Sequence, residues 1–289
     1  MKNNESPSKG AYYASLDEKG NENYKNYESH NRHIEIIEKC FSAIFDYNQE
    51  FQGGGGLIEF KNKHEKAPIY LIVTASHVVV ECASVCENLK EEYCIKIPIS
   101  DSVKKDGNGE FSSLYILPLK NNISINKNLD LALIQLTAGI EELKERYFTI
   151  TYEDKFLHKI DQEVLICSIP ANRVRRATRK VFKSETCNGI IVNAFQLPTK
   201  IVGIDGDFFD IAYPNQIYTM NEKCNFKPLE GKSPDPHGFS GSIVWDYSGN
   251  TVKPLGIVIE LKNGNIRCLS FNTIIDFLNN ELANNVTKK

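Results

Sequence analysis

The sequence predicts an all-β protein built from two antiparallel β-barrels. Short apolar segments rich in β-branched residues follow one another along most of the 289-residue chain, and such segments are typical of strands. A polar interval near residue 150 divides them into two groups. Helical periodicity appears only before the first group and after the last strand. Many strands with so few helices favour barrels over alternating β-strand and α-helix units.

The chain begins with a segment that we expect to form a flexible arm. Residues 1–30 are polar and mixed in charge and have no periodic apolar face, so they cannot bury much surface. From residue 31, apolar residues recur at steps of three and four, which predicts an amphipathic helix; they are Ile34, Ile37, Phe41 and Ile44. Residues 41–45 (FSAIF) fit a first strand equally well, and so short a run leaves both possibilities open.

The first barrel is expected within residues 31–150, helix included. A glycine cluster at 53–56 opens into a strand, and residues 67–80 (APIYLIVTASHVVV) are β-branched enough to form a buried strand. The glycines precede a strand and not a helix, so we do not expect them to bind phosphate. Further strands are predicted in the segments YCIKIPIS, SSLYILPL and LDLALIQL, at 93–100, 112–119 and 129–136.

The second barrel is expected within residues 151–289. Its predicted strands lie at 162–170, 187–195, 241–250 and 252–261, with a tight turn in WDYSGN at 245–250. The last element, 272–285, is predicted to be a helix with one apolar side formed by Ile274, Ile275, Leu278 and Leu282. Asn272 or Thr273 would cap its N-terminus.

Composition and charge exclude several functions. The 34 basic and 37 acidic residues leave a net charge of −3, so no overall field attracts nucleic acid or anionic lipid. An apolar content of 41% is enough for a core. No run reaches the roughly 18 apolar residues of a membrane span, and the first thirty residues lack the apolar region of a secretory signal. We therefore expect a cytoplasmic protein that does not bind membranes.

The eight cysteines are expected to be reduced thiols, as is usual in the cytosol. Cys82, Cys86 and Cys94 cluster in the sequence, with His64 and His77 nearby. Their spacing contains no C-x-x-C pair, so buried structural thiols account for them better than a zinc site does. The sequence thus predicts neither a metal nor a cofactor.

Three segments carry residues suited to acyl transfer by a serine. They are TASHVV with His77, NLDLALIQL with Asp130 and HGFSGSIVW with Ser240. That chemistry needs a base for the hydroxyl proton, a carboxylate to orient the base, and N–H donors for the oxyanion. Small residues around Ser240 would allow a sharp turn in which the N–H groups of Gly238 and Ser240 point at one place. Taken singly, each residue is more often structural. A histidine such as His77 usually has its hydrogen bonds satisfied within the fold, and Asp130 and Ser240 would usually be turn residues.

Together, the three segments resemble the trypsin-like serine peptidases, particularly the bacterial and organellar members without disulfides. The histidine lies in TASH at 74–77, the aspartate opens DLALIQL at 130–136, and the serine lies in GFSGS at 238–242. The chain order His, Asp, Ser also agrees with the family. The resemblance covers roughly residues 41–285.

The resemblance implies a single peptidase domain of two six-stranded antiparallel barrels followed by a C-terminal helix. It implies that Ser240 is the nucleophile, His77 the general base and acid, and Asp130 the orienting carboxylate. The N–H groups of Gly238 and Ser240 would form the oxyanion hole. The function implied is a serine endopeptidase that cleaves proteins or peptides through an acyl-enzyme, in limited or regulated intracellular proteolysis.

The same resemblance points to residues that would bind substrate. In the family, the pocket is built from the segment before the serine and the strand after it, which here are 233–238 and 259–264. The candidates are Asp235, His237, Ile259 and Glu260. Asp235 and His237 could equally be loop residues without contact to substrate.

Phe239 departs from the secreted members of the family, and one charge cluster stands apart from the resemblance. Phe239 stands where they carry an aspartate, so activation by a newly cut N-terminus is not expected. This departure leaves an alternative open, namely a catalytically inactive trypsin-like scaffold that binds a peptide or protein. The segment from Arg173 to Lys183 holds six basic residues and no acidic one. It is either a solvated loop or a site for an acidic partner, and no pattern of stacking aromatic residues accompanies it that would favour nucleic acid.

Overall fold

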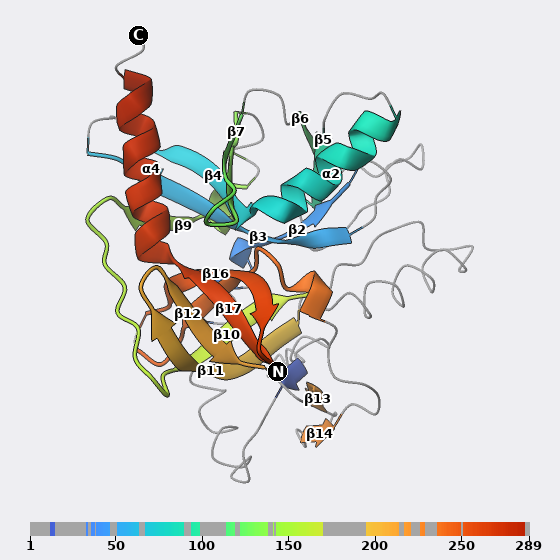
Figure 1. The fold of residues 1–289 in the computed structure, drawn as a ribbon, viewed down its shortest axis with the longest axis vertical. Coiled ribbons are helices and arrows are strands. Elements are labelled where there is room, and N and C mark those ends of the chain that lie inside the picture. Colours follow the sequence, from blue (N-terminus) through green and yellow to red (C-terminus); the bar gives the residue numbers. More distant parts are fainter. Residues whose placement is uncertain are drawn as a thin grey trace, which may run out of the picture.

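The structure is a computed structural model, shown in Figure 1. It describes residues 12–14, 33, 36–37, 39–46, 51–63, 67–89, 94–98, 114–118, 122–137, 141, 143–169, 195–213, 217–220, 226–228, 236–249 and 251–286. The basic segment from Arg173 to Lys183, Asp235 and most of the expected arm at 1–30 lie outside the described residues.

The N-terminal half forms an eight-stranded sheet in which β6, β5, β2, β3, β4, β8 and β7 pair in that order and β9 pairs with β3. The strands are β2 (Phe41–Phe45), β3 (Phe51–Lys61), β4 (Ile69–Ala75), β5 (Cys94–Pro98), β6 (Leu114–Pro118), β7 (Ile123–Asn126), β8 (Leu131–Gln135) and β9 (Phe148–Thr151).

This first sheet differs from the closed six-stranded barrel that the resemblance implies. The long strand β3 pairs with β2 through its first half and with β9, in parallel, through residues Ile58 to Lys61. Strands β2 and β9 both pair with the same side of β3, because residues Gly56 and Ile58 pair with β4 on the other side. One strand thus continues past its first neighbour to a second. Pairings between the described residues do not close this sheet.

The C-terminal half contains a closed barrel of six strands, in the order β10, β11, β12, β17, β16 and β15. They are β10 (Glu163–Ser168), β11 (Phe195–Asp205), β12 (Phe208–Ala212), β15 (Ile243–Asp246), β16 (Lys253–Lys262) and β17 (Asn265–Ser270). Every pairing is antiparallel. The predicted all-β class and the second barrel are therefore confirmed.

Turn residues explain how the barrel hairpins close. Between β16 and β17, Asn263 and Gly264 have φ angles of +52° and +79°, the left-handed conformation that two-residue hairpin turns require. The turn between β15 and β16 follows Asp246, whose carboxylate accepts hydrogen bonds from the amide and hydroxyl of Ser248. The predicted turn at 245–250 is confirmed.

A third, small sheet consists of β1, β13 and β14, with β13 in the centre. Its strands are β1 (Tyr12–Ala14), β13 (Ile217–Met220) and β14 (Phe226–Pro228). Within the expected arm, Tyr12 to Ala14 therefore form a strand that pairs with the second half of the chain.

The chain before β2 is helical at each described residue from 33 to 40, as the periodicity predicts. Residues 41–45 form strand β2, which decides between the two interpretations of FSAIF. A further helix, α2 (Ser76–Leu89), was not predicted from the sequence. The strand expected at 67–80 ends at Ala75, so the prediction of a strand at residues 76–80 was wrong.

Packing explains why this β-branched segment is helical. Val78, Val79 and Cys82 are buried on α2 and pack with Ile72 and Ala132 of the first sheet in one apolar cluster. Residues 78 and 82 lie one turn apart, on the same face of a helix. Figure 1 shows α2 lying over the strands of this sheet. Burial of this face outweighs the weak preference of valine for strands.

The terminal helix α4 (Phe271–Val286) is confirmed, and Ile274, Ile275 and Leu278 of its predicted apolar side are buried. Its cap differs from the prediction. The amide of Asn272 donates to Ser270 Oγ at 3.3 Å, whereas the Asn272 side chain bonds the backbone of Phe156. Ser270 therefore occupies the capping position, because Asn272 already lies inside the helix and faces a neighbouring loop.

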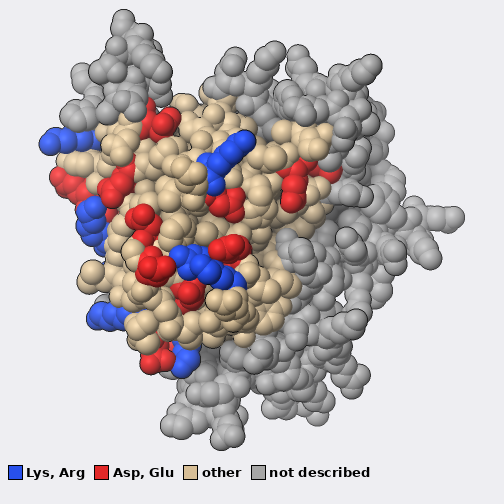
Figure 2. Space-filling view, viewed as in Figure 1, with Lys and Arg blue, Asp and Glu red and all other residues tan. Residues whose placement is uncertain are grey.

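Charged side chains on the face seen in Figure 2 are mixed in sign, with Lys and Arg beside Asp and Glu. Arg267, for example, lies 3.0 Å from Asp205 Oδ2 and stacks over the ring of Phe208. Among the described residues, no helix is long and apolar enough to cross a membrane.

Candidate active site

The two halves of the chain meet at the glycine cluster, which lies inside β3 and not before a strand as expected. A side chain at Gly54 would collide with Ser242 and Phe41, and one at Gly56 would collide with Ile243. The amide of Gly54 donates a hydrogen bond of 2.8 Å to the carbonyl of Ser240. Glycine is required here because the segment that carries Ser240 packs directly against the backbone of β3.

His77 and Asp130 come from the ends of neighbouring elements in the first sheet. β4 pairs with β8 up to Ala75 and Leu131, and His77 is the second residue of α2, just after β4. The amide of Ser76 continues the pairing with a 3.0 Å hydrogen bond to the carbonyl of Asp130. The two side chains therefore leave the sheet at the same place.

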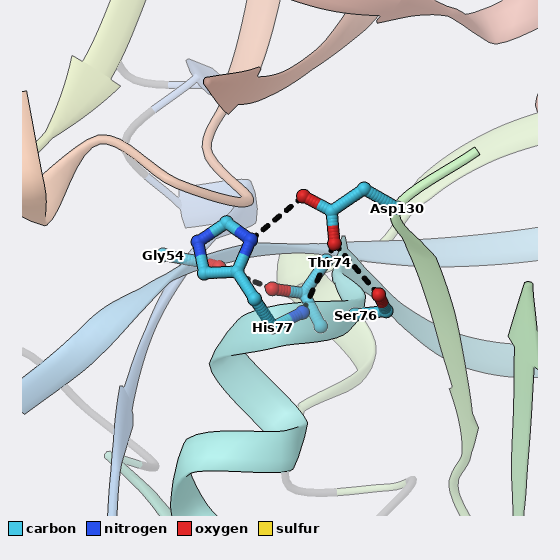
Figure 3. A network of polar contacts seen from close by, with 5 residues as sticks. All are labelled: Gly54, Thr74, Ser76, His77 and Asp130. Atoms are coloured by element: carbon cyan, nitrogen blue, oxygen red, sulfur yellow. Dashed lines mark hydrogen bonds and ion pairs between the residues drawn. The ribbon is translucent and has the colours of Figure 1, made fainter. Parts of the chain in front are cut away.

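The carboxylate of Asp130 contacts His77 through both of its oxygens (Figure 3). Oδ2 lies 2.7 Å from His77 Nδ1, and Oδ1 accepts the backbone amide of His77 at 3.0 Å. This geometry places the ring proton of a neutral His77 on Nδ1, so Nε2 carries the free lone pair. In Figure 3 this second ring nitrogen points away from Asp130, where it can accept a proton.

The electrostatics of the pair favour its charged forms. The hydrogen bond that the His77 ring donates to Asp130 raises the pKa of His77 above its ordinary value, although partial burial acts in the opposite direction. Burial acts to raise the pKa of Asp130, but hydrogen bonds from His77 and Ser76 outweigh it and the pKa is lowered. The pair is half-buried, with His77 37% exposed and Asp130 28% exposed. A carboxylate next to a histidine of raised pKa is suited to stabilise an imidazolium.

Asp130 is held in an unusual backbone conformation. Its φ angle is +50°, in the left-handed region that few residues other than glycine adopt. The turn before it is fixed by the Asn126 side chain, which accepts the amides of Asn128 and Leu129. Asp130 directly precedes strand β8, as predicted, and closes the β7–β8 turn.

Ser240 lies in a turn between the short helix η2 (Pro236–Gly238) and β15. The amide of Phe239 donates to Pro236, and that of Ser242 donates to Phe239. Gly241 has a φ of +80°, and any side chain there would collide with Gly54 and Thr74. The small residues around Ser240 are thus required, as predicted, by a tight turn, and this turn contacts β3 and β4.

Ser240 and the start of α2 border the same glycine. A Cβ atom at Gly53 would lie 2.8 Å from the Ser240 carbonyl oxygen and 2.7 Å from a methyl group of Val78. Within the part of the chain that the structure describes, no hydrogen bond joins the Ser240 hydroxyl to the His77 ring. Catalytic hydrogen bonds are often long in the absence of substrate.

A buried chain of hydroxyl groups fixes the segment before Ser240. Ser242 Oγ donates to Ser168 Oγ at 2.8 Å, and Ser168 Oγ donates to the carbonyl of Gly238 at 2.9 Å. Both serines are 0% exposed. The peptide that joins Gly238 to Phe239 is therefore anchored at its oxygen by Ser168 and at its nitrogen by Pro236.

The candidate substrate-binding residues differ in their exposure and in how much of each one the structure describes. Glu260 is exposed on β16, with its Oε1 4.0 Å from Arg267 Nε. Ile259 is buried, at 6% exposure. The backbone of His237 belongs to η2, and its side chain and all of Asp235 lie outside the described residues.

Two polar residues beside His77 were not singled out in the sequence. Ser76 Oγ donates to Asp130 Oδ1 at 2.6 Å, and Thr74 Oγ1 donates to the carbonyl of Gly54 at 2.7 Å. The signal was present in TASH, where two hydroxyl residues alternate before the histidine. Sequence alone does not show which partner such a hydroxyl finds.

No group of three or more His, Cys, Asp or Glu side chains is arranged to hold a metal ion within the described ranges. The cysteines whose side chains are described there are all buried; they are Cys40, Cys82, Cys167 and Cys268. Of the cysteines at 82, 86 and 94, Cys82 packs in the apolar cluster under α2, as expected of a structural thiol.

No protein-family model matches the chain, and no curated protein sequence matches it. Solved structures similar to it include a serine endoprotease from Yersinia pestis, at 12% identity and a TM-score of 0.46, with 86% of this chain and 64% of that chain covered. Human heparin binding protein matches at 11% identity and a TM-score of 0.48. The match covers 86% of this chain and 93% of that protein.

An inactive mutant of Rv3671c from M. tuberculosis H37Rv matches at 13% identity and a TM-score of 0.46, over 86% of this chain and 89% of that one. Identities and TM-scores this low assign no activity to the chain.

Proposed function

We propose that the protein is a serine endopeptidase in which Ser240, His77 and Asp130 act together. The observation that carries the proposal is the contact of 2.7 Å between His77 Nδ1 and Asp130 Oδ2, at the place where the Ser240 turn packs on β3. A histidine oriented by a carboxylate and adjacent to a serine in a tight turn is the arrangement that acyl transfer requires.

In the proposed reaction, His77 Nε2 takes the proton of the Ser240 hydroxyl as Oγ attacks the carbonyl carbon of a peptide bond. The imidazolium that forms is stabilised by Asp130, which stays ionised. His77 then gives the proton to the leaving amine, and an acyl-enzyme remains on Ser240. A water molecule, deprotonated by His77, hydrolyses the ester and restores the serine.

The N–H groups of Gly238 and Ser240 are the proposed donors to the oxyanion. The peptide after Gly238 is anchored at both ends, and the Ser240 carbonyl is bound by Gly54. Donors on a segment held in this way need little reorganisation as the negative charge develops.

Limited cleavage of particular proteins is the proposed role. Phe239, which precedes the nucleophile, is 0% exposed in the core. The turn is therefore ordered by packing, and no charged pair with a new N-terminus is needed to form it. Cytoplasmic location and substrate binding near Asp235, His237, Ile259 and Glu260 are part of the same proposal.

A fluorophosphonate probe tests the proposal, because it reacts with an activated serine. We expect the purified chain to be labelled and the Ser240→Ala variant to remain unlabelled. Ser248→Ala is the matched control, since Ser248 lies exposed in the β15–β16 turn. Absence of labelling in the folded wild-type chain would refute the enzyme and favour the alternative, an inactive scaffold that binds a peptide or protein.

A further inference from the structure

Ser76 contacts Asp130 through both its side chain and its backbone. Its Oγ donates to Asp130 Oδ1 at 2.6 Å, and its amide donates to the Asp130 carbonyl at 3.0 Å. Ser76 is 5% exposed, so its hydroxyl exchanges little with water. Figure 3 shows the hydroxyl and the His77 amide converging on the same carboxylate oxygen.

The two carboxylate oxygens of Asp130 therefore have different hydrogen-bond partners. Oδ1 accepts from Ser76 and from the His77 amide, whereas Oδ2 contacts the His77 ring. A carboxylate with only one bound oxygen can rotate about its χ2 bond, because that torsion is broad. Donors on Oδ1 restrict this rotation and keep Oδ2 directed at Nδ1.

We propose that Ser76 is a positioning residue for the catalytic pair, which acts through Asp130 and does not touch the substrate. This inference rests on the proposed function. The Ser76 hydroxyl fixes the plane of the carboxylate and so the tautomer and orientation of the His77 ring. The His77 amide alone holds Oδ1 less firmly, because it belongs to the same residue whose ring must be oriented.

Two carboxylates act on the His77 ring in the described structure. Asp130 from the β7–β8 turn is the main one, and Glu81, one helical turn further along α2, also raises the pKa of His77. Glu81 is exposed, and among the described residues it forms no hydrogen bond with Ser76. A change at Ser76 is therefore expected to alter the contribution of Asp130 and leave that of Glu81 unchanged.

The test compares Ser76→Ala with Ser76→Thr in the full chain. NMR titration of the His77 ring reports its pKa without any need for catalysis, and the pH dependence of fluorophosphonate labelling reports reactivity. In Ser76→Ala we expect the pKa of His77 to fall, because its hydrogen bond to Asp130 is loosened. We expect labelling to slow about tenfold, the size of one lost hydrogen bond to a charged group. Ser76→Thr keeps the hydroxyl and should restore both.

Unchanged His77 titration and labelling in a folded Ser76→Ala variant would overturn the inference, as would a loss of thermal stability with no change in titration. If the alanine variant fails to fold, Ser76→Cys keeps the volume but donates weakly, and it should shift the titration in the same direction. A wild-type chain that is not labelled refutes the proposed function, but the NMR titration still decides the role of Ser76.

Discussion

The amide of Gly54 donates a hydrogen bond to the carbonyl of Ser240. Gly54 lies on β3 of the first sheet, beside β4, the strand that leads into His77, whereas Ser240 lies just before β15 of the second barrel. This one backbone contact joins the half that carries the base to the half that carries the proposed nucleophile. Changes in either half can therefore act on the other through this contact.

Replacing Gly54 tests the close approach. In Gly54→Ala the new methyl group would collide with Ser242 and Phe41. We expect a loss of roughly 1–3 kcal/mol in the free energy of unfolding, measured in urea, and a large drop in labelling. Gly249→Ala is the control, because the nearest atom to a Cβ there is 3.8 Å away. Equal stability of the two variants would contradict this account of the glycine cluster.

Asp130→Asn tests the orientation of the histidine. An amide keeps the shape of the carboxylate but can present a donor to Nδ1, which favours the wrong ring tautomer. We expect the labelling rate to fall by roughly a thousandfold or more, while folding, followed by circular dichroism, changes little. The pKa of His77 should also fall, because its main stabilising partner loses its charge. Labelling within a few-fold of wild type would exclude the proposed role of Asp130.

Labelling of Ser240 should depend on the protonation of His77. Only the neutral ring can accept the serine proton, so the rate should rise with pH as His77 loses its own proton. Since the pKa of His77 is raised, the midpoint is expected above its ordinary value of about 6.5. A series of labelling rates from pH 5 to 9 measures this, and a midpoint below that value would contradict the structure.

The same pair links stability to pH. The raised pKa of His77 contributes stability that is complete below its unfolded pKa and is lost as the pH rises through its folded value. The lowered pKa of Asp130 contributes stability above its unfolded pKa, which is lost as the pH falls through its folded value. The free energies of unfolding of the wild type and of His77→Ala, measured in urea, should differ most at pH values above the unfolded pKa of Asp130 and below the unfolded pKa of His77. A difference that does not vary with pH would show that the pair contributes no linked stability.

The buried hydroxyl chain is expected to be costly to break. Ser168→Ala removes the donor to Gly238 and the acceptor for Ser242, which leaves two buried polar groups without this partner. We expect a loss of about 1–3 kcal/mol in the free energy of unfolding. The double variant with Ser242→Ala should cost less than the sum of the single changes. Additive costs would show that the two hydroxyls are independent.

The proximity of His77 and Asp130 could be predicted from the sequence, whereas the helix beside them could not. His77 and Asp130 lie next to apolar strands whose pairing is visible as β-branched runs, so their proximity follows from pairing β4 with β8. Helix α2 was missed because its first turn continues a β-branched strand without any break such as glycine or proline. Its helical state depends on tertiary burial of Val78 and Cys82, which no local pattern records.

The roles of the glycines and of Ser76 also depended on tertiary contacts. The sequence predicts that GGGG opens a strand, but its position inside β3 is set by the approach of Ser242 and Ile243 from the other half of the chain. A hydrogen bond such as that of Ser76 depends on where a side chain more than fifty residues away ends. Local spacing does not contain this information.

The contact between Gly54 and Ser240 also bears on the order of events in folding. His77 and Asp130 can be brought together within the first sheet alone, whereas Ser240 reaches them only after the second barrel has formed and docked. Contacts between residues so distant in the chain carry a large loop-closure cost and form slowly. A newly synthesised chain would thus carry an oriented His77 before Ser240, the proposed nucleophile, came near it. Its reactivity would appear in a single late step, when the last hairpins of the barrel close.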